Sequence, residues 1–165
     1  MTTVKSWARR PPDVANLFNP AFCAALLNRL AVGFQVDVKQ GVPYPLAFVA
    51  LPLLLHPGSV ALLPQTARTR FHAWILENPQ VLFGFPERAR ALAPIVREAV
   101  SFGLRYEILG VGADATLVPM APSELKRWEK NSYNKDLSKN AQTLGKLLAQ
   151  IKDVPTIFAL FGVRP

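Results

Sequence analysis

The spacing of apolar residues along this chain predicts a mainly helical protein. Asn19 followed by Pro20 is a typical helix start, because asparagine caps the first turn and proline fits there without a backbone hydrogen. Apolar side chains then recur every four residues, at Phe22, Leu26, Leu30 and Phe34. The first predicted element is therefore a helix from residue 20 to about residue 36, with one apolar face.

An uncharged, almost wholly apolar run extends from Tyr44 to Pro64. A helix that spans a membrane needs about 20 consecutive apolar residues, and this run is interrupted at Pro52 and by a Pro-Gly turn after His56. We therefore expect a buried helix over residues 45–55 rather than a membrane span, followed by a short piece that stops at Pro64. The sequence leaves open whether this helix lies in the chain's own core or against a partner.

Two more helices are expected before residue 104. The first opens with Thr66 as its cap, ends at Asn78, and places on one side Phe71, Trp74 and Ile75. The second has Pro86 in its first turn and Gly103 as its C-cap. Its inward face is predicted to hold Leu92, Ile95, Val96, Ala99 and Val100. Its outer stripe is predicted to hold Glu87, Arg90, Arg97 and Ser101.

The segment from Arg105 to Met120 predicts a β-hairpin, because two short runs rich in Ile, Leu, Val and Tyr flank a turn with two glycines. A winged-helix domain has this element order, in which helices are followed by a hairpin. Its last helix before the hairpin usually lies in a DNA groove and contacts the bases. The predicted fold class is thus mainly α with a small β part (α+β), and the first domain, residues 1–121, is helical and winged-helix-like.

The composition changes after residue 121 and predicts a C-terminal helical extension over residues 122–165. Ser123 is expected to cap a short charged helix, and a polar linker follows it. A longer helix then shows alternating steps of four and three at Leu137, Ala141, Leu144, Leu148 and Ile151. Such a narrow seam suits one helix packing on another, so the extension should pack on the first domain or on a partner.

The composition and the N-terminal sequence add three constraints to this outline. Half of the 165 residues are hydrophobic, 18% are charged and the mean hydropathy is +0.18, so a core or partner subunits must bury much apolar surface. The net charge of +8 and the pI near 10.1 favour polyanionic partners such as nucleic acid. The lone Cys23 and an N-terminus without an apolar signal segment indicate a cytoplasmic protein.

Residues that could carry catalysis are few. The two histidines and Cys23 show no metal-ligand spacing, and no loop has the lysine and hydroxyl that cradle a nucleotide phosphate. Cys23 is interpreted as a buried apolar residue rather than a nucleophile. Glu124 and Lys126, with Asp114 before them, match the carboxylates and lysine of a nuclease class, but three common residues in a charged segment indicate a solvated face. We therefore expect no enzyme activity, metal or cofactor.

Basic residues are the remaining candidates for a binding site. The predicted nucleic-acid contacts are Arg88, Arg90, Arg97, Lys126, Arg127, Lys130, Lys139 and Lys146. Such a field of charge can hold a phosphate backbone without reading its bases. Interspersed acidic residues such as Glu87, Glu98 and Glu129 support the alternative interpretation, an ordinary soluble surface.

Three stretches carry a family resemblance. They contain the helix start at Asn19-Pro20, the sequence LPLLLH from Leu51 to His56, and the GVRP sequence that begins at Gly162. In this order, over nearly the whole chain, they resemble the middle component of bacterial three-component ABC ATPase (ABC-3C) systems. The resemblance brings no active-site residues with it.

The resemblance implies a non-enzymatic middle subunit that bridges an SMC-like ABC ATPase and an effector protein. It implies a role in Lamassu-like defence against phage or plasmids, with ATP bound by the partner ATPase and with possible contact to DNA. The candidate partner interface is the C-terminal tail, at Ile157, Phe158, Phe161 and Arg164. The alternative function is a free-standing winged-helix DNA-binding regulator, in which the arginines before the hairpin matter most.

Overall fold

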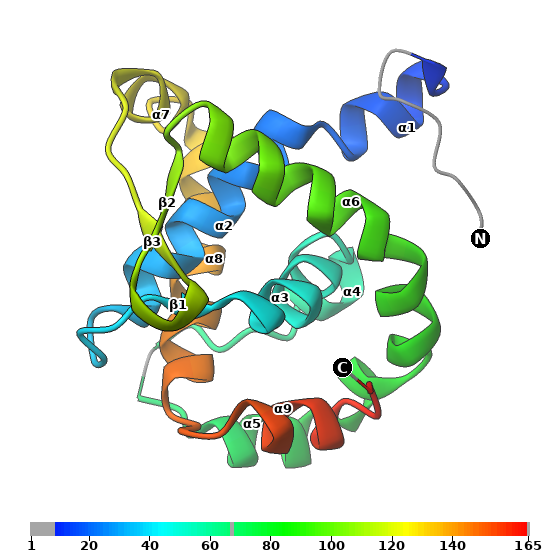
Figure 1. The fold of residues 1–165 in the computed structure, drawn as a ribbon. Helices are drawn as coiled ribbons and strands as arrows, with labels where there is room; N and C mark the ends of the chain where they lie inside the picture. Colours follow the sequence, from blue (N-terminus) through cyan, green and yellow to red (C-terminus); the bar gives the residue numbers. More distant parts are fainter. Residues whose placement is uncertain (1–8, 67, 165) are drawn as a thin grey trace.

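A computed structural model describes residues 9–66 and 68–164 of the chain, and these residues are mainly helical (Figure 1). The α-helices are α1 (Pro12–Leu17), α2 (Pro20–Phe34), α3 (Ala47–Leu54), α4 (Pro57–Val60), α5 (Phe71–Glu77), α6 (Phe85–Arg105), α7 (Ser123–Trp128), α8 (Ser132–Ala149) and α9 (Val154–Leu160). Short 3-10 turns are η2 (Tyr44–Leu46), η3 (Pro79–Leu82) and η4 (Ala113–Ala115). The strands are β1 (Val42–Pro43), β2 (Leu109–Val111) and β3 (Thr116–Pro119). The prediction of a mainly helical chain with a small β part is confirmed.

Helix α2 forms the centre of the structure and begins where the sequence predicts. The side chain of Asn19 accepts hydrogen bonds from the backbone nitrogens of Ala21, at 2.9 Å, and Phe22, at 3.4 Å. Helix α8 packs along α2, and α6 arcs over the other side of it (Figure 1). Most of α2 is buried, so it serves as the common packing partner for both halves of the sequence.

The apolar run after residue 44 lies in the chain's own core. Helix α3 is short and contains the buried Pro52, and its residues Val49, Ala50, Leu51 and Leu53 are at most 1% exposed. Among the described residues, one helical stretch, Pro12–Phe34, is long and apolar enough by composition to cross a membrane, and 56% of its apolar window is buried inside the chain. The question that the sequence left open for α3 is thus answered by burial against α2 and α6.

Helix α6 extends beyond the residue predicted to cap it. A Cβ on Gly103 would lie 2.7 Å from a methyl carbon of Leu109, so this glycine allows close packing inside the helix and does not end it. The helix ends instead through Glu107, which has a φ of 54° and a backbone nitrogen that donates to the oxygen of Leu104 at 3.4 Å. Ile108 donates to the oxygen of Gly103 at 2.8 Å, which completes a Schellman turn with glutamate in the position usually held by glycine.

The predicted hairpin is present and gains a third strand. The sheet is antiparallel with the order β1-β3-β2, and Val42 pairs with Leu117 while Gly110 pairs with Val118. Strand β1 comes from the segment between α2 and α3 and pairs with β3, so it joins the hairpin to the helical part of the chain. This sheet lies beside α2 (Figure 1).

Other helix boundaries differ from the predictions. Helix α5 begins at Phe71 with Arg70 as its N-cap, so the Thr66 cap is wrong. Helix α7 includes Ser123 as its first residue, and that side chain makes no cap hydrogen bond. Part of the predicted polar linker is helical, because the side chain of Asn131 accepts a hydrogen bond from the backbone nitrogen of Tyr133 at 2.9 Å and caps α8.

Candidate functional site

Five of the eight basic residues predicted to contact nucleic acid line one of two clefts, and these clefts share no lining residue. The first, which we call the arginine cleft, has a volume of about 590 Å³ and runs beside α6. Its lining residues are Tyr44, Pro45, Phe48, Pro86, Ala89, Arg90, Ala93, Arg97, Phe158, Gly162, Val163 and Arg164. It thus combines two arginines predicted to contact nucleic acid with the tail arginine predicted to contact a partner.

Two of the three arginines come from one face of α6. Arg90 and Arg97 are exposed and lie seven residues apart, which is about two helical turns, so their side chains point to the same side. The residues between them on that face are small, because Ala93 lies one turn after Arg90 and one turn before Arg97. The helix therefore supplies an apolar floor with a cation at each end.

The third arginine is placed by the turn that ends α9. Gly162 has a φ of 65° and its backbone nitrogen donates to the oxygen of Ala159 at 3.1 Å. Val163 donates to the oxygen of Phe158 at 2.9 Å, and these two bonds make a Schellman turn. The turn directs Val163 and Arg164 to the arginine cleft, whose lining includes both. The glycine of the terminal GVRP sequence therefore has a conformational role.

The arginine cleft combines positive charge with an apolar, partly aromatic lining. The guanidinium carbon of Arg97 lies 5.8 Å from the ring centroid of Phe48, within the range of a cation–π contact. Tyr44 packs edge-on against Phe48, with 5.3 Å between the ring centroids. The described lining contains three arginines and no Asp or Glu. The cleft is thus positively charged at its sides and apolar at its base.

Arg88 does not join the other two arginines of α6. Its guanidinium carbon lies 5.3 Å from the ring centroid of Phe85, and its Nη1 donates to the oxygen of Phe83 at 3.5 Å. Burial lowers the pKa of Arg88 from its ordinary value. In the described part of the chain, its Nε and Nη2 atoms are buried without a hydrogen-bond partner. A side chain held in this way is poorly placed for a surface contact.

The second hollow, which we call the lysine cleft, has a volume of about 770 Å³ and lies along α8. Its charged lining residues are Glu129, Lys130, Lys135, Asp136, Lys139 and Lys146. It therefore contains three of the five lysines and arginines predicted downstream of the hairpin. Lys126 and Arg127 are exposed on α7 and line neither cleft.

The tail residues predicted to face a partner are mostly internal. Ile157, Phe158 and Phe161 are 0%, 4% and 2% exposed. The ring of Phe161 lies 4.6 Å from that of Phe85 and 6.3 Å from that of Phe71, measured between centroids. These three side chains stabilise the chain's own core, and of the four predicted interface residues Arg164 alone is exposed. The phenylalanines of the predicted interface are thus covered by the chain's own residues, because α9 folds back against Phe71 of α5 and Phe85 of α6.

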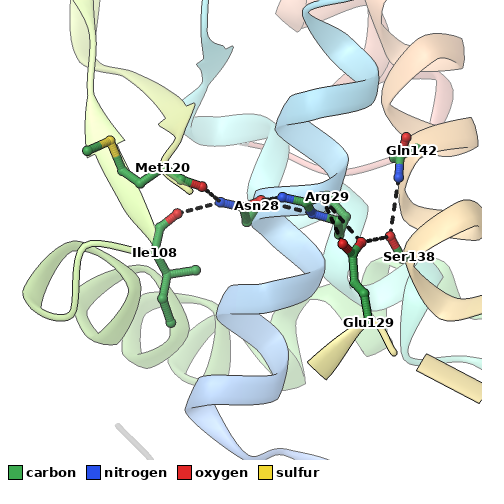
Figure 2. A network of polar contacts seen from close by, with 7 residues as sticks. All are labelled: Asn28, Arg29, Ile108, Met120, Glu129, Ser138 and Gln142. Carbon is green, nitrogen blue, oxygen red and sulfur yellow. Dashed lines mark hydrogen bonds and ion pairs between the residues drawn. The ribbon is translucent and has the colours of Figure 1, made fainter. Parts of the chain in front are cut away.

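A partly buried polar network that sequence reasoning did not identify joins the hairpin to the helices (Figure 2). The Nδ2 atom of Asn28, which is 0% exposed, donates to the oxygens of Ile108, at 2.6 Å, and Met120, at 2.8 Å. Ile108 precedes β2 and Met120 follows β3, so one side-chain amide binds both ends of the hairpin. A polar residue inside the otherwise apolar face of α2 was the available sequence signal.

The network continues from α2 to α8. Arg29 donates to the Oδ1 atom of Asn28 through Nε at 3.0 Å and Nη2 at 2.5 Å, and its Nη1 lies 3.2 Å from a carboxylate oxygen of Glu129. Glu129 accepts a short hydrogen bond from Ser138, whose hydroxyl oxygen also accepts from Gln142 at 3.2 Å (Figure 2). Because Glu129 and Ser138 border the lysine cleft, the same network connects that cleft to the hairpin.

The residues considered for catalysis differ in their surroundings. Cys23 is 0% exposed, and burial, with a smaller contribution from Glu98, raises the pKa of its thiol to about 12. Hydrogen bonds from its own backbone nitrogen and then from Ser123 lower the pKa of the exposed Glu124. The Nδ1 atom of His56 accepts a hydrogen bond from the backbone nitrogen of Ser59 at 3.1 Å. Within residues 9–66 and 68–164, no three His, Cys, Asp or Glu side chains are grouped to hold a metal.

Comparison with known protein families gives a match over nearly the whole chain. The family model described as ABC-three component (ABC-3C) system Middle Component 3 matches residues 7–165. No curated protein and no solved structure matches the chain.

Proposed function

The chain belongs to the Middle Component 3 family of ABC-three component systems, and from this we propose that it is a non-enzymatic subunit that bridges an SMC-like ABC ATPase and an effector. One observation carries the proposal: the arginine cleft and the lysine cleft are separate surfaces of different chemistry. A bridging subunit needs two such surfaces, because each partner must be held without excluding the other.

The rest of the proposal follows from the chemistry that this chain does and does not supply. The thiol of Cys23 is buried and its pKa is raised, which keeps it from acting as a nucleophile. ATP binding and hydrolysis are assigned to the ATPase partner, and cutting or another toxic activity to the effector. We propose that this assembly acts in the cytoplasm against phage or plasmids.

Co-purification tests the bridging role. The chain carries an N-terminal affinity tag, is expressed with its neighbouring genes in the native cell, and is recovered after nuclease treatment. Mass spectrometry should find an ABC ATPase and a second component in stoichiometric amounts. Recovery of the ATPase should persist when the effector gene is deleted, and recovery of the effector should persist when the ATPase gene is deleted. Isolation of this chain alone from such cells would contradict the proposal.

Contact with DNA is a second candidate function, supported by the lysine cleft. Lys130, Lys139 and Lys146 line it together with Lys135, and its polar surface suits a phosphate backbone. Duplex binding should weaken with salt, and the triple variant Lys130→Glu, Lys139→Glu, Lys146→Glu should remove it. Arg68→Glu is a control on an exposed residue outside both clefts. Equal binding by wild type and the triple variant would exclude the lysine cleft.

The winged-helix interpretation belongs to this second candidate. It is supported by the element order, in which α6 precedes the hairpin, and by β1 joining the hairpin through β3. A free-standing regulator would bind one DNA sequence as an isolated chain and would lose that binding on substitution of Arg90 or Arg97. The apolar base of the arginine cleft favours a protein partner over a DNA groove at this position.

A further inference from the structure

We propose that the arginine cleft binds an acidic segment of a partner component, anchored by one large apolar side chain. This inference rests on the proposed bridging function and names the chemistry of one of its two contacts. Three features of the cleft carry it: the small residues of its base, the aromatic pair at its side, and the excess of positive charge around it.

The base of the cleft has room for an inserted side chain. Pro86, Ala89 and Ala93 of α6 form it, and none of them reaches far from the helix. Ala89 is 4% exposed whereas Ala93 is half-buried, so Ala93 is the more accessible of these two residues. An apolar side chain inserted over Ala93 would enter a cleft that Val163 and Phe48 also line. Buried aromatic and aliphatic anchors supply most of the free energy in such contacts.

The charge around the cleft selects an acidic partner. Arg90, Arg97 and Arg164 are exposed and no acidic residue shares the described lining. The lysine cleft differs, because Glu129 and Asp136 lie among its lysines and offset part of their charge. Guanidinium groups bind carboxylates with two parallel hydrogen bonds, so Asp or Glu on both sides of the anchor would satisfy the three arginines.

A protein segment fits this cleft better than nucleic acid. Arg97 covers the ring of Phe48, and Tyr44 packs edge-on against the same ring. This arrangement leaves that aromatic pair poorly available for stacking a base, which single-stranded nucleic acid needs in addition to charge. A phosphate backbone has no apolar group for the base of the cleft. Nucleic acid is therefore an outcome to be tested and not part of the proposal.

Site-specific photo-crosslinking in the intact complex tests the inference. Benzoylphenylalanine replaces Pro45 in one strain and Ala91 in another, where Pro45 is an exposed lining residue away from the base of the cleft and Ala91 is an exposed residue of α6 outside it. We expect a crosslink from position 45 to a partner segment that contains a large apolar residue flanked by Asp or Glu, and little or none from position 91. Exchanging those acids for arginine should weaken assembly, and combining that exchange with Arg97→Glu should restore it in part.

Matched substitutions give a second readout. Arg90→Glu with Arg97→Glu should lower partner recovery about tenfold or more, whereas the control pair Arg68→Glu with Lys152→Glu, also exposed, should not. Ala93→Trp should act like the first pair, and Ala91→Trp like the second. Circular dichroism of each purified variant shows whether it has folded. Only folded variants are compared.

Several results would overturn the inference. These are a crosslink from position 45 to a basic or uncharged segment or to DNA, equal crosslinking from positions 45 and 91, and full partner recovery by the folded Ala93→Trp variant. If partners co-purify with wild type under these conditions, the cleft assignment fails while the bridging function stands. If no partner co-purifies with wild type, the bridging function itself fails.

Discussion

Gly33 of α2 and Gly145 of α8 lie where the two helices cross, and each leaves room for the other helix's backbone. A Cβ on Gly33 would overlap the carbonyl oxygen of Gln142, and a Cβ on Gly145 would overlap that of Leu30. The close approach explains why α8, part of the predicted extension, packs so tightly along α2. The two halves of the sequence meet here backbone to backbone.

Alanine at either glycine should destabilise the protein, although alanine normally favours a helix over glycine by up to about 1 kcal/mol. Overpacking of this kind costs typically 1–3 kcal/mol, and here the obstacle is backbone, so we expect a net loss of about 2 kcal/mol or more. Urea unfolding of Gly33→Ala and Gly145→Ala measures it. Lys139→Ala, at an exposed position of α8, is the control. A gain in stability for either glycine variant would mean that the helices separate easily.

The amide of Asn28 should be worth more than an ordinary surface hydrogen bond. Asn28→Leu keeps the size of the side chain but removes both hydrogen bonds, so that the oxygen of Met120 loses this donor while the oxygen of Ile108 keeps the backbone nitrogen of Met120 at 3.1 Å. An unsatisfied buried group costs about 1–3 kcal/mol, so we expect a loss of about 1–3 kcal/mol in the free energy of unfolding. Asn16→Leu, at an exposed position, should change little. Faster amide exchange in β2 and β3 of the Asn28 variant, measured below its unfolding midpoint, would locate the effect in the hairpin.

Aspartate at Phe161 should prevent folding rather than merely block assembly. The carboxylate would replace a ring packed against Phe71 and Phe85, so a cavity and a buried charge would arise together. We expect loss of cooperative thermal unfolding for Phe161→Asp and for Phe158→Asp. Ala159→Asp is the matched control, because Ala159 is an exposed residue of the same helix. A normal melting curve for Phe161→Asp together with lost partner recovery would contradict this prediction and would indicate that Phe161 contacts the partner.

Cys23 should make stability depend on pH above neutrality. Its folded-state pKa is raised from 9.0 to about 12, so the unfolded chain loses the thiol proton at lower pH than the folded chain does. The stability held by the protonated thiol is therefore complete below about pH 9 and is lost as pH rises toward 12, by up to about 1.4 kcal/mol per unit. Other groups also titrate in this range, so the measurement is the difference between wild type and Cys23→Ala in urea unfolding from pH 8 to pH 10.5. Equal pH dependence in both proteins would show that the thiol ionises in the folded state.

Local patterns in the sequence predicted the helices but not all of their ends. Periodicity and caps sufficed for α2, whose asparagine and proline act within one turn. They failed to predict the end of α6. The sequence predicts Gly103 as the C-cap, but this glycine is required by the close approach of Leu109, which belongs to the following strand. The residue with the left-handed conformation is Glu107, and a glutamate gives no sequence signal for that conformation. Helix α5 begins later than its threonine suggested, since the cap depends on backbone geometry and not on residue type alone.

The candidate site was predictable in its residue types and not in its grouping. Arg90 and Arg97 share a face at helical spacing, which the sequence shows directly. Their meeting with Arg164 depends on α9 folding back and on the turn at Gly162, which are non-local events. The same holds for Arg29 and Glu129, which are separated by 100 residues in the chain. Tail phenylalanines look identical in sequence whether they meet a partner or the chain's own core.

The small sheet has a consequence for how other molecules can recognise this chain. Its edge strands are β1, with two residues of which one is Pro43, and β2, with three residues. Strand addition by a partner, or stacking of one copy on another into a fibril, needs a longer row of free backbone groups than these edges offer. In the described part of the chain, the sheet edges therefore offer little to a partner strand, and their shortness protects an unusually apolar protein from edge-to-edge aggregation.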